Sequence, residues 1–504
     1  MGAEAAMIQT AVLLVPFPAQ GHVTPMLHLA RALAAHGAAA TVAVPDFIHR
    51  RIAGIVEGGD GVELASIPSG ITEGSGAGND ETPGFGAIAQ AMEHHMPAHL
   101  ERMLTRRRPA VACVVVDVLA SWAIPVAARC GVPATGFWPA MLASYRVVAA
   151  IPELMEKGLI SESGTPISPS NQSDNEQIIQ DQMIRGLKIL PAQVELRTKE
   201  LPWLVGDSVT QKSRFAFWLQ TLHRARSFRA VLVNSFPDEA GEDVGHLSKQ
   251  SPRILPVGPA LLPGLGSSAE RTKGSTDAVA SPQPCSNKNP SMWRADSSCI
   301  GWLDAQRAGS VVYVSFGSWV GPIGPDKIRE LALGLEATGR PFLWALKRDP
   351  SWRAGLPDGF AERIAAAGRG KVVDWAPQED VLRHRAVGCY LTHCGWNSTL
   401  EAVQHGVRLL CYPVSGDQFI NCAYITGLWE IGLKLGSMSR DDVKDRIARI
   451  MEGDDGRRLQ ENVRLLREKV VTTEARRSAD RNVRSFVDEI KKDQPLLMQI
   501  YSVL

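Results

Sequence analysis

The sequence predicts an α/β protein with two doubly wound, Rossmann-like domains, and three observations lead to this prediction. Short and nearly continuous apolar runs alternate with helical periods along both halves of the chain. Such runs are typical of parallel strands that helices cover on both faces of the sheet. A polar segment rich in Gly, Pro, Ser and Asn separates the halves, and the length of 504 residues suits two large domains.

The first half of the chain carries the alternation expected of an N-terminal domain. Apolar runs such as TAVLLVP and AVACVVVD predict strands at 10–16, 40–45, 110–117 and 132–138. The segments MLHLARALAAHG and LASWAIPVAARCG have a helical period and lie at 26–37 and 119–131. A polar stretch from Ser161 to Gln182 predicts a surface loop inside this domain.

The alternation starts again after the polar segment. Further strands are predicted at 309–318, 341–347, 371–375, 388–393 and 407–413. Helices are predicted at 328–339, 398–406 and 418–430. We therefore expect an N-terminal domain over 1–258, a flexible linker over 259–300 and a C-terminal domain over 301–474, with a helix at about 475–492 packed back on the first domain.

Charge and composition narrow the class of function. The chain has 54 basic and 53 acidic residues, which disfavours nucleic acid or an anionic membrane as the main partner. No run of 18 apolar residues predicts a membrane span, and the N-terminus is typical of a first strand rather than a signal peptide. Eight cysteines without a CxxC pair indicate reduced thiols, so we expect a cytoplasmic monomer that acts on small molecules.

His22 and Asp117 are the candidate catalytic residues of the first domain. His22 follows the first predicted strand in the loop FPAQGHVTP, and Asp117 ends a later strand. Because the carboxyl ends of parallel strands meet at one edge of a sheet, both side chains should lie on the same rim. A carboxylate behind a histidine fixes the tautomer of the imidazole, as a general base requires. The alternative is a solvated loop histidine and an aspartate that caps the next helix.

A candidate phosphate site lies in the second domain, where a strand gives way to a helix within LTHCGWNSTLEAV. Free N–H groups at a helix N-terminus, together with small polar side chains, suit a phosphate group. The residues at this position are His393, Gly395, Asn397 and Ser398. The alternative is a capping box in which Ser398 and Glu401 only stabilise the helix.

Further polar and aromatic residues fall on the same predicted rim. Gly317 and Ser318 form a turn after the strand VVYVSF and can face the same phosphates. Asp417 and Gln418 start a helix after VRLLCYPVSG. Trp375 and Trp396 adjoin strand ends, where exposed aromatics can stack on bases or sugars, and the alternative is that both are core residues. No G-x-x-x-x-G-K-[ST] loop is present, which disfavours a nucleoside triphosphatase.

The stretch from Trp375 to Gln418, WAPQEDVLRHRAVGCYLTHCGWNSTLEAVQHGVRLLCYPVSGDQ, closely resembles the signature box of plant secondary-product (family 1) UDP-glycosyltransferases. The resemblance extends over most of the chain, because PFPAQGHVTPML, VLVNSFPDEA, ILPVGP and CIGWLDAQRAGSVVYVSFGS also look like segments of that family. It implies the two-domain GT-B fold, whose parallel sheets face an interdomain cleft. The acceptor then binds mainly in the first domain and the nucleotide sugar mainly in the second.

The resemblance also implies a role for each site residue. Trp375 would stack on uracil, with Ala376 and Gln378 near the base and ribose and Glu401 accepting from the ribose hydroxyls. The diphosphate would be held by Ser318, His393, Gly395, Asn397 and Ser398. The sugar would contact Trp396, Asp417 and Gln418, the last being the residue that glucose-using members carry. His22, with Asp117 as its partner, would deprotonate the acceptor hydroxyl.

The chain departs from the family pattern at several positions. Arg408 stands where the family usually has Pro, and Pro139 occupies a place where several members use Thr to touch the sugar. Tyr412 and Gly416 replace a commoner Trp and Ala near the sugar. The apolar tail PLLMQIYSVL has no family counterpart that we can place.

The resulting expectation is an inverting transfer of glucose from UDP-glucose to a hydroxyl of a small lipophilic acceptor such as a flavonoid or another phenolic. No metal or other cofactor is expected, since helix dipoles and neutral donors can stabilise the leaving diphosphate. The segments from about Asp80 to His99 and from Leu142 to Val205 should line the acceptor pocket. The alternatives are a different donor sugar, an N-, S- or carboxyl acceptor, or a UDP-sugar-binding protein without turnover, and the acceptor's identity does not follow from the sequence.

Overall fold

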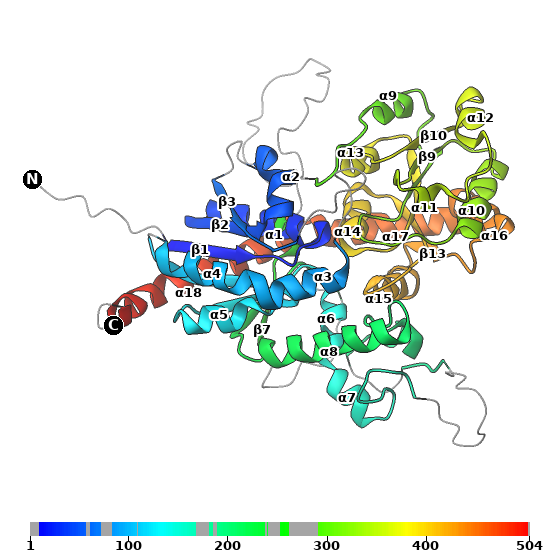
Figure 1. Cartoon of the computed structure of the whole chain (residues 1–504). Helices are drawn as coiled ribbons and strands as arrows, with labels where there is room; N and C mark the ends of the chain where they lie inside the picture. The colour runs from blue at the N-terminus through cyan, green and yellow to red at the C-terminus, as the bar shows by residue number, and fades with distance from the viewer. Residues whose placement is uncertain are drawn as a thin grey trace, which may run out of the picture.

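The computed structural model describes residues 10–56, 61–71, 83–107, 109–167, 181–184, 189–236, 239, 252–261 and 291–501. Most of the expected loop from Ser161 to Gln182 and of the expected linker over 259–300 lies outside these residues. Within them the chain forms two lobes, each with a parallel sheet at its centre (Figure 1).

The first sheet has seven parallel strands in the described part of the chain, in the order β3-β2-β1-β4-β5-β6-β7. Their bounds are β1 (Thr10–Val15), β2 (Ala38–Pro45), β3 (Val62–Ile67), β4 (Val111–Asp117), β5 (Ala134–Trp138), β6 (Ala230–Val233) and β7 (Arg253–Pro256). The strand order reverses between β1 and β4, which pair directly, with Val15 opposite Val116. The carboxyl ends of two neighbouring parallel strands at such a reversal form a ligand-binding crevice.

Helices cover both faces of the first sheet and bury its apolar side chains. They are α1 (Gln20–Ala35), α2 (Asp46–Val56), α3 (Phe85–Gln90), η1 (Ala91–His95), α4 (Met96–Arg106), η2 (Val118–Ala120), α5 (Ala123–Arg129), α6 (Leu142–Ala149), α7 (Ile151–Glu156), η3 (Thr198–Glu200), α8 (Ser208–Ala225) and η4 (Gly258–Leu261). Burial of every residue of β1 and β4 explains why these strands have continuous apolar runs.

The second sheet has six strands among the described residues, in the order β10-β9-β8-β11-β12-β13, again all parallel. The strands are β8 (Val311–Ser315), β9 (Phe342–Ala345), β10 (Gly370–Val373), β11 (Val387–Thr392), β12 (Arg408–Cys411) and β13 (Gly432–Lys434). Here the order reverses between β8 and β11, where Ser315 lies opposite Thr392. The doubly wound α/β prediction is therefore confirmed for both halves of the chain.

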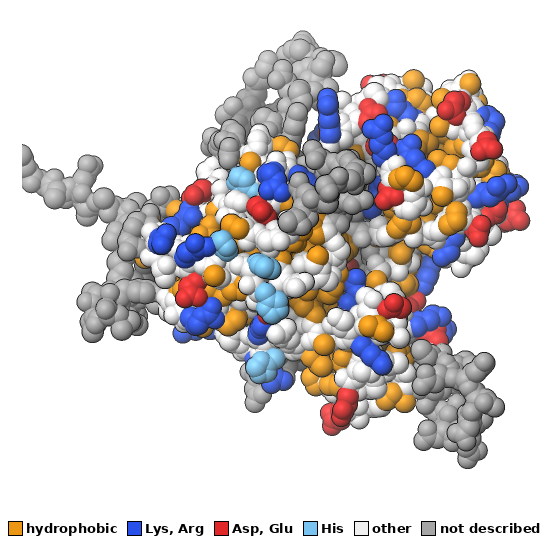
Figure 2. Space-filling model, viewed as in Figure 1, with side chains coloured by type: hydrophobic (Ala, Val, Ile, Leu, Met, Phe, Trp, Pro, Cys, Tyr) orange, Lys and Arg blue, Asp and Glu red, His pale blue; other side chains and the backbone are white. Residues whose placement is uncertain are grey.

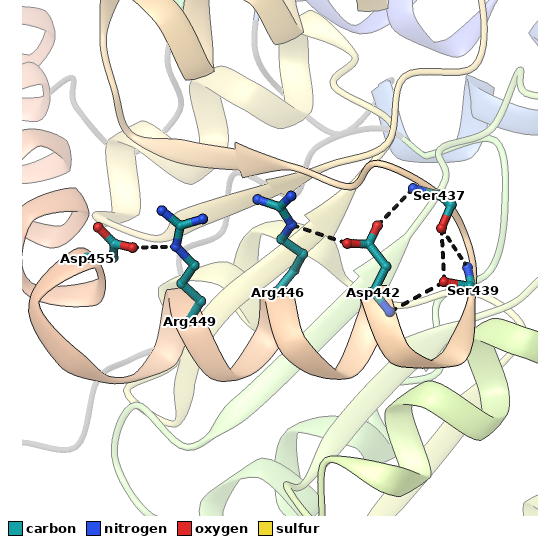
Figure 3. A network of polar contacts seen from close by, with 6 residues as sticks. All are labelled: Ser437, Ser439, Asp442, Arg446, Arg449 and Asp455. Carbon is teal, nitrogen blue, oxygen red and sulfur yellow. Dashed lines mark hydrogen bonds and ion pairs between the residues drawn. The ribbon is translucent and has the colours of Figure 1, made fainter.

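The helices of the second lobe pack on this sheet and are α9 (Ser298–Asp304), α10 (Pro325–Ala337), α11 (Pro350–Arg353), α12 (Phe360–Ala366), α13 (Gln378–Arg383), α14 (Trp396–His405), α15 (Gln418–Ala423), η5 (Tyr424–Leu428), α16 (Arg440–Met451) and α17 (Gly453–Val471). Figure 3 shows how α16 begins and ends. Ser439 caps it by accepting from the backbone N–H of Asp442, whose carboxylate accepts from Arg446 at 3.2 Å one turn later. At the other end, Arg449 pairs with Asp455 at the start of α17.

The last helix, α18 (Thr473–Tyr501), returns to the first lobe and runs along its sheet (Figure 1). Its apolar face packs into the core there through Val483, Phe486, Val487 and Ile490. The Asn482 side chain also donates to the carbonyl of Pro256, at 2.8 Å, at the end of β7. This C-terminal helix therefore connects the second lobe back to the first lobe through a buried contact. The connection adds to the one that the polar segment makes along the chain.

The C-terminal end of the expected linker is not a free segment. Met292 is buried in the core of the first lobe, and its N–H donates to Gln20 Oε1 at 2.9 Å. Trp293 packs against Trp375 of the second lobe. Two large apolar side chains within a polar stretch thus anchor this end of the expected linker to both lobes, and the linker boundaries stay a prediction.

Arg408, the departure from the family's usual Pro, has a structural role. Its guanidinium donates to the carbonyls of Gly388, Ile450 and Gly456, at 3.2, 2.8 and 3.1 Å. These contacts join the start of β12 to β11, to the end of α16 and to the start of α17. They lie at the edge of the sheet opposite to the carboxyl ends of the strands. Elsewhere on the surface, Lys and Arg are interspersed with Asp and Glu on the face shown in Figure 2, as the balanced charge predicts.

Candidate active site in the cleft between the domains

The two switch points face each other across one cleft. Its volume is about 1380 Å³, and both lobes line it. The first lobe contributes residues after β1, after β5 and from α8, while the second contributes the segments that follow β8, β10, β11 and β12. The lining includes all the site residues expected from the sequence except Asp117, which lies directly behind His22.

His22 and Asp117 form the pair that the sequence predicts. His22 Nδ1 donates to Asp117 Oδ2 at 2.8 Å, and Asp117 is fully buried while the His22 side chain is 23% exposed. A carboxylate on Nδ1 leaves Nε2 without a proton and turned away from the carboxylate. Asp117 Oδ1 also accepts from the N–H of Leu119 at 2.9 Å, so the helix-capping alternative is correct as well and the two roles use different oxygens.

His22 does not lie in a loop, as the sequence analysis expected, but in the first turn of α1. The helix begins at Gln20, six residues before the predicted start, and includes Pro25. Pro25 removes one N–H donor from the helix, which nevertheless begins before it. The helical turn gives the imidazole a fixed direction and seats Phe17 against it, with ring centroids 5.1 Å apart.

The phosphate site expected in the second lobe is built around His393 and Gly395. Gly395 is the N-cap of α14, and a Cβ on it would lie 2.4 Å from His393 Nε2. Gly317 approaches the same ring from the β8 turn, with a positive φ of 71°. Burial, with the Lys347 cation nearby, lowers the pKa of His393 to about 4, so the imidazole is neutral. Two tight turns therefore surround a neutral hydrogen-bonding ring beside a helix N-terminus.

Ser398 and Glu401 do not form a capping box. The first helical residue of α14 is Trp396, and Gly395 caps the helix without any side-chain hydrogen bond. Instead, Gln378 Nε2 donates to Ser398 Oγ at 3.0 Å and to Glu401 Oε2 at 2.7 Å. Burial raises the pKa of Glu401 to about 7. A carboxylate held in this way at the cleft wall is an acceptor for hydroxyl groups of a ligand.

Two tryptophans of the predicted site behave differently. Trp375 lines the cleft and stacks on Trp293, with centroids 4.7 Å apart and planes at 27°. Trp396 is 4% exposed, donates from Nε1 to the carbonyl of Asn234, and packs on Phe236 and Trp429. For Trp396 the structure agrees with the alternative of a core residue, because its ring fills the interface between the lobes.

Asp417 and Gln418 lie at the start of α15, as expected. Asp417 Oδ2 accepts from Asn421 Nδ2 at 3.0 Å, and burial raises the pKa of this carboxyl. Gln418 Oε1 accepts from the N–H groups of Val414 and Ser415 at 2.9 and 3.0 Å. The amide oxygen of Gln418 is therefore committed to the loop.

Sequence reasoning missed Trp319, which lines the cleft, and Lys347, which lies next to it. Trp319, beside the predicted Gly317–Ser318 turn, reaches across to Phe17 with centroids 6.1 Å apart. Lys347 lies behind the same turn and donates to the carbonyls of Ser318 and Val320 at 2.9 and 2.8 Å. Burial lowers the pKa of this lysine to about 8. No motif marks either residue, although the position of Trp319 next to a predicted ligand turn was a usable signal.

Of the segments expected to line the acceptor pocket, the structure places five described residues in the cleft wall: Phe85, Ser144, Val148, Pro202 and Val205. Pro139, where several relatives use Thr, also lines the cleft, and its carbonyl accepts from Asn234 Nδ2 at 3.1 Å. Parts of both expected segments, including Asp80, lie outside the described residues.

Three cysteines meet in the core beneath the phosphate turn. Cys394, Cys411 and Cys422 are buried, and their sulfur atoms all lie within 4.8 Å of one another. From the sequence we expect reduced thiols and no metal. Spacing of this kind suits a thiophilic cation as well as a packed group of thiols. All seven cysteines in the described residues are free; the eighth, at position 285, lies outside them.

Comparison with known proteins agrees with this geometry. A family model described as "UDP-glucoronosyl and UDP-glucosyl transferase" matches residues 293–468, and one described as "Glycosyltransferase, N-terminal domain" matches residues 8–68. The chain is 43% identical over 493 residues to UDP-glycosyltransferase 82A1 of Arabidopsis thaliana, covering 95% of this chain and 98% of the relative.

The chain belongs to the UDP-glycosyltransferase family. Among solved structures, Os79 from O. sativa in complex with UDP superposes with a TM-score of 0.73 at 26% identity, covering 95% of this chain and all of that one. A UDP-glucose:anthocyanidin 3-O-glucosyltransferase in complex with UDP gives the same TM-score at 25% identity over 96% and 99% of the two chains. The fold is accordingly GT-B, and this UDP-glycosyltransferase takes a UDP-sugar as its donor. Among its described helices, none is both long and apolar enough to cross a bilayer.

Proposed function

We propose that this UDP-glycosyltransferase transfers glucose from UDP-glucose to a hydroxyl group of a small, largely apolar acceptor, with inversion at the anomeric carbon. The observation that carries the proposal is the His22–Asp117 pair, 2.8 Å apart, on the wall of a cleft whose opposite wall is the candidate diphosphate site. The acceptor's hydroxyl proton passes to His22 Nε2, and Asp117 stabilises the resulting imidazolium.

On the donor side, each group takes a separate part of UDP-glucose. Trp375 stacks on the uracil, Gln378 and Ala376 lie near the base and ribose, and Glu401 accepts from the ribose hydroxyls. The diphosphate binds to Ser318, His393, Gly395, Asn397 and Ser398. The glucose contacts Asp417 and Gln418, while Trp396 contributes its backbone because its ring lies in the interface between the lobes.

The chemical step follows from this placement. The acceptor oxygen attacks the anomeric carbon from the face opposite the diphosphate, the bond from that carbon to the UDP oxygen breaks, and UDP leaves. Charge that develops on the diphosphate meets neutral donors and a helix N-terminus, so we propose that no metal is required. The seven free thiols of the described chain suit a reducing compartment and support the cytoplasm as the site of action.

The test is a UDP-release assay over a panel of hydroxylated acceptors, with UDP-glucose, UDP-galactose, UDP-xylose and UDP-glucuronate as donors. We expect release to be fastest with UDP-glucose and to depend on the acceptor, and proton NMR of the product should show a β-glucoside. Preference for another donor would replace glucose in the proposal. Binding of UDP-sugars without release for any acceptor would favour a binding protein without turnover.

A further inference from the structure

The acceptor half of the cleft is lined mainly by apolar side chains and, among the described residues, by two titratable ones. Its wall in the first lobe contains the aromatic and aliphatic residues Phe17, Phe85, Trp138, Val148, Phe217 and Trp218. Among the described residues of this lobe that line the cleft, only His22 and Arg214 carry a titratable group. The other cations of the lining, Arg294 and Arg383, belong to the donor side, next to Trp293 and on α13.

Arg214 has no partner among the described residues apart from an aromatic ring. It lies on α8, its guanidinium carbon is 4.4 Å from the centroid of Phe85, and its Nε is buried without a hydrogen bond. Arg224 on the same helix is satisfied, since it donates to both carboxylate oxygens of Glu93 at 2.7 and 2.9 Å. Of these two arginines of α8, Arg224 is thus paired with a carboxylate, whereas Arg214 lines the cleft.

Leaving a guanidinium half-buried and unpaired is unfavourable. It presents five N–H donors and stays charged at neutral pH, although burial lowers the pKa of Arg214. Contact with the face of Phe85 offsets only part of the lost hydration, because the ring accepts none of the in-plane N–H bonds. A ligand that brings an anion into the apolar cleft would satisfy these donors.

Arg214 lies on the same wall as the catalytic pair. The Phe17 ring is 5.1 Å from the His22 ring and 6.5 Å from the Phe85 ring, and Phe85 in turn lies under the Arg214 guanidinium. Phe217 extends this surface, edge-on to Phe85 at 5.3 Å. An acceptor with its hydroxyl at His22 and its apolar body along Phe17 and Phe85 therefore places its far end at Arg214.

We propose that Arg214 binds a carboxylate of the acceptor, so that the substrate is a hydroxylated apolar acid glycosylated at its hydroxyl group. A carboxylate matches the planar, two-pronged geometry of a guanidinium. This inference rests on the proposed glycosyl transfer and adds to it the chemical class of the acceptor. Arg214 acts on binding, away from the reacting atoms, and so determines specificity.

The experiment compares hydroxylated aromatic acids of increasing length with their carboxamides, using kcat/KM from UDP release and mass spectrometry of the product. The variant is Arg214→Gln, and Arg226→Gln is the matched control, because Arg226 is exposed just after the same helix and outside the cleft lining. We expect the wild type and Arg226→Gln to prefer the best acid over its amide by about tenfold to a hundredfold, mainly through KM. Arg214→Gln should abolish that preference, mainly by lowering kcat/KM for the acid toward the value for its amide.

Two further measurements separate this inference from the function on which it rests. Hydroxylamine cleaves glucose esters but leaves hydroxyl-linked glucosides intact, so a labile product would mean that the carboxylate itself reacts and would overturn the assignment. Quenching of cleft tryptophan fluorescence reports acid binding without turnover. Equal binding of acids and amides, or no effect of Arg214→Gln, would overturn the inference, whereas selective acid binding without UDP release would retain it and refute only the transferase proposal.

Discussion

Asn397, in the first turn of α14, donates from Nδ2 to the carbonyl of Gly21 in α1 at 3.0 Å, and so joins the two lobes at the active site. That carbonyl is available because of Pro25. In a regular helix the N–H of residue 25 would bond to the carbonyl of residue 21, and proline has no N–H. The irregularity in α1 thus creates an acceptor one residue before His22, and the signature box of the second lobe supplies the donor.

A double-mutant cycle tests this relationship. Asn397→Ala in the wild type should lower the free energy of unfolding by about 1 kcal/mol, since it removes a hydrogen bond to a backbone carbonyl. Pro25→Ala restores a backbone N–H at position 25, which can donate to Gly21 within α1, so Asn397→Ala should cost less in that background. The urea midpoints of the four proteins give the coupling energy, which we expect at about 0.5–1.5 kcal/mol. Strictly additive effects would mean that the contact carries no coupling.

The positions of the site residues could be predicted from the sequence because they depend on the order of the strands. The predictions failed at residues whose contacts cross between the lobes. His22 and Asp117 follow neighbouring strands at one reversal of strand order, and His393 and Ser318 do so at the other. Strand alternation is enough to place such residues. The helical start of α1, the burial of Trp396 and the anchoring of Met292 and Trp293 depend on partners far away in the chain, which periodicity does not reveal.

The same distinction applies to local motifs. S-T-L-E has the spacing of a capping box, yet the side chains of Ser398 and Glu401 both accept from Gln378, which belongs to another helix. Arg408 stands out in the sequence only as a departure from the family's Pro, although it donates to three backbone carbonyls. In each case the residue type was informative, and the partner was set by packing of elements distant in sequence.

Removal of the general base should abolish transfer without loss of donor binding. His22→Ala is expected to lower kcat by at least about a hundredfold, the usual contribution of a positioned base, while the Kd for UDP stays within about twofold. Asp117→Asn should give a loss of the same order, because the amide oxygen keeps the N–H of Leu119 and the amide NH2 then donates to Nδ1, which leaves the proton on Nε2. Steady-state kinetics and calorimetric titration with UDP test both, and unchanged turnover in His22→Ala would refute the mechanism.

Lys347 should act on the donor through the turn that it supports. Lys347→Met leaves the carbonyls of Ser318 and Val320 without their donor and should raise the KM for the UDP-sugar by about tenfold, the effect of a lost hydrogen bond to a charged group. The matched control is Lys444→Met on the exposed face of α16. An equal change in both variants, or a loss confined to kcat with an unaltered KM, would contradict this role.

Chelation should not affect transfer. The neutral donors of the site and the N-terminus of α14 face the diphosphate position, so EDTA treatment followed by assay in metal-free buffer should leave kcat/KM within about twofold. Elemental analysis of the purified protein is the control. A loss of activity that Zn²⁺ restores would point to the buried Cys394, Cys411 and Cys422 group as a metal site, and Cys411→Ser would then show the same loss without chelation.

Glu401 should make stability depend on pH in a predictable direction. Burial raises the pKa of its carboxyl in the folded protein to about 7, from a value of 4.5 for an unburied carboxyl. The folded state therefore holds the proton more tightly, and this contribution to stability is complete below pH 4.5 and is lost as the pH rises through 7. The shift corresponds to about 3 kcal/mol.

Glu401→Gln removes this titration while keeping the shape and an acceptor for Gln378. Relative to the wild type, the variant should gain stability between about pH 4.5 and 8, and the difference between the two melting temperatures should level off above about pH 8. Glu239, whose pKa burial also raises to about 7, is present in both proteins and cancels in that difference. A pH-independent difference would contradict the assignment. Added UDP should stabilise the wild type more than the variant at about pH 8, because the ionised carboxylate is the better acceptor for ribose hydroxyls.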